Sequence, residues 1–79
     1  MKLLVRNLAR TTSEHELRTL FQDFGTVKEC TLVLDAETGE SKGFGFVEMP
    51  DEAEAKQAMN ALNLSTFAKN KIRVKPAQS

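Results

Sequence analysis

The sequence has few of the features that mark secreted or membrane proteins. Its 79 residues include one cysteine, Cys30, so no internal disulfide can form. Cys30 lies among strand-forming residues, where we expect a small buried hydrophobic side chain rather than a nucleophile. No run of about 18 apolar residues is present, which argues against a transmembrane helix, and the apolar start before Arg6 is too short for a signal peptide. We therefore expect a cytoplasmic protein in a reducing environment, with no membrane partner.

Patterns that carry catalysis, metal binding or cofactor binding are also missing. The single histidine, His15, and Cys30 lie on different predicted elements, and no His/Cys cluster has the spacing of metal ligands. The pair Gly43-x-Gly45 is followed by Glu48 where a dinucleotide-binding fingerprint needs a glycine, and no P-loop occurs. We therefore predict a protein that is not an enzyme, with no catalytic residue, no metal site and no cofactor.

An excess of charge of either sign is absent as well. The 11 basic and 11 acidic residues give a net charge of zero, which argues against strong non-specific binding to a polyanion. The charges are nevertheless segregated: segments 13–24 and 51–62 are mainly acidic, whereas segment 69–75 holds four bases and no acid. A local basic surface is therefore possible on this neutral protein.

Hydrophobic periodicity predicts the elements of the first half. Residues 2–7 alternate as a short strand with a basic outer face. Ser13 and Glu16 have capping-box spacing, and the apolar residues that follow at helical spacing predict a helix over 13–24, ended by Gly25. Residues 27–34 are rich in apolar and β-branched side chains and predict a second strand, followed by a polar loop.

The second half repeats this order. Residues 42–49 predict a third strand, Asp51 begins a predicted helix over 51–62, residues 63–70 form a loop, and residues 71–75 alternate as a fourth strand. The order β-α-β-β-α-β with right-handed crossovers places both helices on one face of the sheet. We therefore predict a single domain spanning 1–79, with its core at about 2–77. Its fold would be an α+β sandwich in which a four-stranded antiparallel sheet carries two helices on one face.

Strand parity assigns each strand residue to one of two faces. The face toward the helices is entirely apolar: Leu3, Val5, Cys30, Leu32, Val47, Met49, Ile72 and Val74. The open face carries Lys2, Leu4, Arg6, Glu29, Thr31, Lys42, Phe44, Phe46, Glu48, Lys71, Arg73 and Lys75. The clean separation of these two sets supports the predicted strand pairing.

The octamer 42–49, Lys-Gly-Phe-Gly-Phe-Val-Glu-Met, is the most informative segment. Phe44 and Phe46 share a face, and the two glycines leave space beneath the strand for a closely packed helix. Because the opposite face also carries apolar side chains, one of the two faces is available for binding. Aromatic rings beside a cation form a stacking platform for unpaired bases. The alternative is that the two rings belong to the core or to a protein-binding patch.

Two separated motifs now point to a family. The octamer fits the pattern Lys/Arg-Gly-Phe/Tyr-Gly/Ala-Phe-Val-x-Phe/Tyr at seven of eight positions, with Met49 the one departure. Residues 3–8, Leu-Leu-Val-Arg-Asn-Leu, match the form Ile/Leu-aromatic-Val-x-Asn-Leu except at Leu4. The chain resembles the RNA-recognition motif family over nearly its whole length. It is similar either to the small stand-alone bacterial members or to one module of a longer protein.

This resemblance implies a ferredoxin-like fold and roles for individual residues. Phe44 and Phe46 would stack on bases or sugars, while Leu4 replaces a third ring and can make only apolar contact. Lys42 would contact phosphate or sugar, or it is a solvated loop charge. A basic rim would hold the RNA backbone, or its members are ordinary surface charges: Lys2, Arg6, Lys71, Arg73 and Lys75.

Several positions keep two interpretations. Glu29 and Glu48 would either repel phosphates or accept hydrogen bonds from base amino groups. Asn7 is interpreted as a strand-end turn former rather than a base reader, and His15 as a solvated surface residue. Segment 76–78 would touch bases through its backbone or form a tail.

The leading hypothesis is a single-stranded RNA-binding module of micromolar or weaker affinity, with weaker binding to single-stranded DNA. The alternative is a protein-interaction domain that uses the same apolar sheet face. We expect a monomer, with a protein partner or weak self-association as the other possibility.

Overall fold

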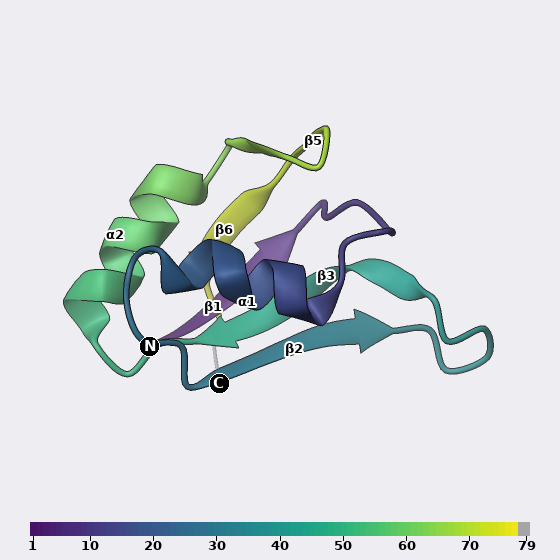
Figure 1. The fold of residues 1–79 in the computed structure, drawn as a ribbon, viewed down its shortest axis with the longest axis horizontal. Helices are drawn as coiled ribbons and strands as arrows, with labels where there is room; N and C mark the ends of the chain where they lie inside the picture. The colour runs from purple at the N-terminus through teal and green to yellow at the C-terminus, as the bar shows by residue number, and fades with distance from the viewer. Residues whose placement is uncertain (78–79) are drawn as a thin grey trace.

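A four-stranded antiparallel sheet with two helices packed on one face forms the body of the protein. The computed structural model describes residues 1–77, and Gln78 of the predicted base-contacting segment 76–78 lies outside them. The elements follow the chain as β1 (Lys2–Arg6), α1 (Glu14–Gln22), β2 (Glu29–Leu34), β3 (Ser41–Glu48), α2 (Glu52–Leu62), β4 (Thr66–Phe67), β5 (Asn70–Lys71) and β6 (Arg73–Pro76). The sheet order is β2-β3-β1-β6, and Figure 1 shows both helices on the near side of this sheet. The predicted fold class is confirmed.

Both helices begin where the capping residues predict. The Ser13 side chain accepts a hydrogen bond from the Glu16 N–H at 3.1 Å, and the Glu16 carboxylate accepts one from the Ser13 N–H at 3.0 Å. This second bond is the main reason that the pKa of Glu16 lies below its ordinary value. The Asp51 side chain caps α2 by accepting from the Glu54 N–H. Within residues 1–77, neither helix is long and apolar enough to cross a membrane.

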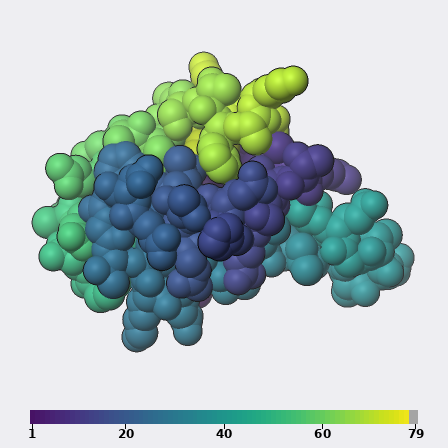
Figure 2. Space-filling view, viewed as in Figure 1, coloured from purple at the N-terminus to yellow at the C-terminus, as the bar shows by residue number. Residues whose placement is uncertain are grey.

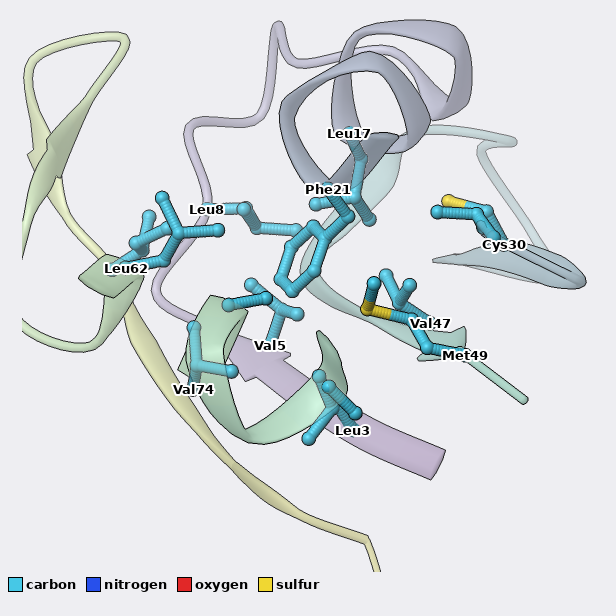
Figure 3. Close-up of a cluster of buried hydrophobic side chains, with 14 residues drawn as sticks. Leu3, Val5, Leu8, Leu17, Phe21, Cys30, Val47, Met49, Leu62 and Val74 are labelled. Carbon is cyan, nitrogen blue, oxygen red and sulfur yellow. The ribbon is translucent and has the colours of Figure 1, made fainter. Parts of the chain in front are cut away.

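The core fills the space between the sheet and the helices. Leu17 and Phe21 from α1 meet side chains from the strands, and Figure 3 shows the Phe21 ring lying among them. Helix α2 adds two alanines and a leucine at helical spacing. The face predicted to be covered is confirmed, because all eight of its members lie in the buried core or, for Leu32, pack against it as a half-buried side chain.

The end of β2 lies outside the core. Leu34 continues the alternation of Cys30 and Leu32, yet 52% of its surface is exposed. The register changes at the same place: Leu32 pairs with Gly45, but Leu34 pairs with Ser41, so β3 uses two more residues than β2 over this step. Such a bulge interrupts the regular pairing along β3, and Gly43 accommodates it with a φ of 84°.

The segment before the last strand also differs from its prediction. Residues 63–70 were expected to form a loop, but β4 and β5 pair as a short hairpin, and β6 begins only at Arg73. Lys71 therefore belongs to β5 and not to the fourth strand of the main sheet. The hairpin turns at Ala68 and Lys69, both with positive φ. Two-residue turns of this kind usually contain Asn-Gly or Asp-Gly, so Ala-Lys gave no sequence signal for the hairpin.

The two glycines of β3 serve different purposes. A Cβ atom at Gly45 would lie 2.5 Å from the Thr31 carbonyl oxygen and 3.3 Å from the Leu17 side chain of α1. The prediction of a closely packed helix beneath this strand is thus confirmed at Gly45. At Gly43 the close neighbour is instead the Leu8 carbonyl oxygen of the β1–α1 loop, at 3.1 Å.

Substitution of Gly45 should test this packing. We expect Gly45→Ala to lower the free energy of unfolding by about 1–3 kcal/mol, because the methyl group overpacks the contact between β2, β3 and α1. Urea unfolding followed by circular dichroism measures the change. The matched control is Gly39→Asn, at a left-handed position where an added Cβ meets no atom within 4 Å, and where asparagine is tolerated. Equal stability of Gly45→Ala and wild type would contradict this close packing of β2, β3 and α1.

Cys30 behaves as a buried hydrophobic residue, as predicted. Burial, reinforced by the Glu14 carboxylate, raises the pKa of its thiol from 9.0 to about 11. Since the thiolate is the reactive form, we expect the native thiol to react with a disulfide reagent at pH 8 about 100-fold more slowly than the urea-unfolded chain. The folded state should also lose stability as the pH rises from about 9 through 11, because the unfolded chain releases this proton first. Equal reaction rates in the two states would show that Cys30 is accessible.

Candidate nucleic-acid interface

Two phenylalanine rings and a leucine occupy the centre of the uncovered sheet face. Phe44 and Phe46 alternate along β3 with Gly45 and Val47, which are buried against the helices, so the two rings point away from the core. Their centroids lie 6.4 Å apart with the planes at 82°. Leu4 of β1 stands directly opposite Phe46 and shares its face. All three side chains are half-buried, and we call them the platform.

Four cations border the platform. The Lys2 ammonium lies 4.9 Å from the centre of the Phe46 ring, within the range of a cation–π contact. On the other side of β1, Lys75 of β6 pairs with Leu4, and Arg73 pairs with Arg6. Because directly opposed residues share a face, these predicted rim residues do gather around the rings, and all four are exposed.

Two further predicted cations occupy different positions. Lys71 lies on β5, outside the four-stranded sheet, so its predicted place in the row of Arg73 and Lys75 is wrong. Lys42 precedes the left-handed Gly43, so strand parity does not assign its face. Lys42 still lies beside Phe44, because both line a cleft at the end of the sheet.

The acidic residues of this face meet at one end of it. Glu48 pairs in register with Lys2 on one side and with Glu29 on the other. The Glu48 carboxylate lies 3.5 Å from the Lys28 ammonium, a residue that the sequence analysis did not single out. An exposed pair of this kind contributes little to stability, about 0–1 kcal/mol, but it offsets one negative charge beside the platform. Within residues 1–77, no three His, Cys, Asp or Glu side chains lie together as a metal site would require.

Asn7 connects the end of β1 to the β4–β5 hairpin. Its φ is 60°, its side-chain amide donates to the Lys71 carbonyl oxygen at 2.7 Å, and its own carbonyl oxygen accepts from the Asn70 amide at 3.2 Å. Asparagine tolerates this left-handed conformation better than most residues. The interpretation of Asn7 as a strand-end turn former is therefore confirmed.

A cleft of about 900 Å³ lies at the end of the sheet where β1 finishes and β3 begins. We call it the loop-end cleft, and it is lined by Arg6, Asn7, Leu8, Ala9, Arg10, Thr11, Lys42, Gly43, Phe44, Asn70 and Arg73. Sequence reasoning missed Arg10 and Asn70 as members of a site. Neither residue lies in a periodic segment, and only the tertiary structure brings them beside Phe44.

Known proteins share both the sequence pattern and this architecture. Residues 3–73 match the RNA recognition motif family. The putative RNA-binding protein RbpA of the cyanobacterium Nostoc sp. is 38% identical over 78 residues, which span 99% of this chain and 76% of that protein. The glycine-rich RNA-binding protein GRP2A of Sinapis alba is also 38% identical, over 99% of this chain and 46% of its own length.

Solved structures agree with these sequence relatives. The crystal structure of RNA binding protein PG1 superposes with a TM-score of 0.97 at 40% identity, covering 100% of this chain and 95% of that one. A Sex-lethal protein–RNA complex superposes with a TM-score of 0.93 at 29% identity, covering 99% of this chain and 47% of that one. From the match over residues 3–73 and the shared fold, we conclude that the chain belongs to the RNA recognition motif family.

Proposed function

We propose that this protein binds single-stranded RNA on the uncovered face of its four-stranded sheet. The observation that carries the proposal is the pair of half-buried rings, Phe44 and Phe46, held 6.4 Å apart on the face that no helix covers. Each ring offers a surface on which an unpaired base can stack, a contact of about 1–3 kcal/mol per base. The names of the relatives, which are RNA-binding proteins, support the same function.

The charges around the platform suit a single strand. Lys2, Arg6, Arg73 and Lys75 lie beside the rings, where phosphates of a strand with stacked bases would pass. A duplex hides its base faces, whereas unpaired bases can be splayed onto aromatic side chains. Because only a few phosphates can be neutralised, the slope of log affinity against log salt should be small, about 0.7 per phosphate.

Leu4 should limit the affinity of the platform. It stands opposite Phe46, where the family motif carries an aromatic residue, and an aliphatic side chain contributes contact area but no stacking. Two rings and a few phosphate contacts correspond to roughly micromolar binding or weaker. Single-stranded DNA can make the same stacking and phosphate contacts, but we expect it to bind more weakly because it lacks the 2′-hydroxyl.

Removal of both rings tests the mechanism. We expect Phe44→Ala combined with Phe46→Ala to weaken binding to a pool of short random RNA by at least about 30-fold, because two stacking contacts of about 1 kcal/mol or more are lost. Fluorescence anisotropy measures the affinity. The companion variant, Phe44→Leu with Phe46→Leu, retains apolar surface and should still lose most of the affinity, which separates stacking from simple burial.

Unchanged RNA affinity in both variants, with the wild-type ¹H–¹⁵N spectrum retained, would refute the platform. The alternative function, a protein-interaction surface on the same face, makes a different prediction. In that case sedimentation of wild type would show a dimer that the alanine variant loses, while neither protein binds RNA.

A third ring should strengthen the platform. We expect Leu4→Phe to tighten RNA binding by about tenfold, because the new ring stands beside Phe46 and can stack one more base at about 1–3 kcal/mol. Isothermal titration calorimetry can measure the change. The control is His15→Phe, which adds a ring to an exposed site on α1, in the layer behind the sheet. Equal gains in the two variants would point to non-specific contact instead.

A further inference from the structure

The loop-end cleft concentrates positive charge on a protein of zero net charge. Four of its lining residues are cationic, namely Arg6, Arg10, Lys42 and Arg73, and among residues 1–77 no carboxylate lines it. Three of these cations come from strands, whereas Arg10 comes from the β1–α1 loop. The cleft is therefore an anion-attracting hollow that continues the platform beyond the end of the sheet, with Phe44 shared between them.

These cations are free to meet an external anion. Within residues 1–77, the ion pairs are Lys28 with Glu48 and Lys56 with Glu52, and neither involves a residue of the cleft. Arg10 and Lys42 also line a neighbouring hollow together with the acids Asp35 and Glu40. The acid whose pKa Arg10 influences is Asp35, at the start of the β2–β3 loop that projects from the body in Figure 2. Its pKa lies below the ordinary value first because the N–H groups of Glu37 and Thr38 donate to it, and only last because of Arg10. Asp35 is thus engaged within its own turn.

Hydrogen bonds from backbone and side-chain donors hold the walls of the cleft. The Leu8 N–H donates to the Gly43 carbonyl oxygen at 2.8 Å, which joins the β1–α1 loop to β3. The Thr12 N–H donates to the Ala9 carbonyl oxygen and closes a turn around Arg10. On the other side, the bonds between Asn7 and the β5 residues hold the hairpin against the end of β1. A hollow with such walls needs little ordering when a ligand enters.

We propose that the loop-end cleft binds a sugar-phosphate unit of the RNA beyond the bases stacked on the platform, with Arg10 as its specific phosphate ligand. Its volume of about 900 Å³ is in the range of ligand pockets, about 300–1,000 Å³, and leaves room for a nucleotide. Arginine presents its donors in a planar fork that fits a phosphate. The inference rests on the proposed function, since the RNA must first lie on the platform.

Extension of an RNA by abasic units tests the cleft separately from stacking. The probe is a random RNA pool of about six nucleotides, with two abasic nucleotides added at its 5′ end, at its 3′ end, or at neither. We expect wild type to bind one of the two extended pools about three- to tenfold more tightly than the plain pool. The reason is that the cleft would bind the sugar-phosphate of an abasic nucleotide and would need no base. Arg10→Gln should abolish this gain and lower the salt slope by about 0.7.

Two control variants separate charge from structure. Arg10→Lys retains the charge and should keep part of the gain. Lys56→Gln removes a cation on α2, where its ammonium lies 3.8 Å from the Glu52 carboxylate, and should keep all of the gain. Anisotropy titrations at two salt concentrations provide these values, and each variant is first checked by its thermal unfolding.

The outcomes distinguish this inference from the proposed function. If wild type binds the plain pool but gains nothing from either extension, or if Arg10→Gln keeps the gain, the cleft is not a phosphate site and the platform stands. If wild type binds none of the pools at low salt, the proposed function fails, and the role of the cleft fails with it.

Discussion

The pairing of β1 with β3 at the centre of the sheet is the constraint on which both the core and the platform depend. The same register places Leu3 opposite Val47 toward the helices and Leu4 opposite Phe46 on the uncovered face. A slip of one residue would turn every one of these side chains to the wrong face. Gly45 lets α1 approach this pair closely, so packing beneath the strand supports the position of the rings above it.

The zero net charge conceals a separation of charges between the layers. Acidic residues occupy the first turn of both helices, where their negative charge interacts favourably with the positive end of the helix dipole. Another acid, Asp51, caps the start of α2. Cations border the platform and line the loop-end cleft. The acids thus stabilise the helical layer and leave the basic field on the opposite face. The exceptions on the sheet face are Glu29 and Glu48, which pair in register, and the Glu48 carboxylate is next to Lys28.

Much of the fold could be predicted because its signals are local. The capping residues Ser13 and Asp51 mark the helix starts, and the alternation in β1 and β3 assigns Phe44 and Phe46 to a common face before any coordinates are known. The error lies where the alternation is interrupted. Lys71 belongs to a hairpin whose turn has positive φ at residues that rarely adopt it. The bulge in β3 beside Leu34 is likewise a feature of strand pairing that no local pattern marks.

By itself the sequence determined the order of the two helices and the four main strands, the apolar face toward the helices and the pair of rings on the uncovered face, because periods of 2 and 3.6 residues can be recognised from neighbouring positions. Only the tertiary structure decided that Arg10, Lys42, Asn70 and Arg73 surround one hollow. These residues come from three distant parts of the chain, near positions 10, 42 and 70–73, and the cleft depends on long-range bonds such as those between Asn7 and β5. Local sequence patterns do not predict this cleft, because it forms only when the β1–α1 loop, the bulge at Gly43 and the β4–β5 hairpin pack together.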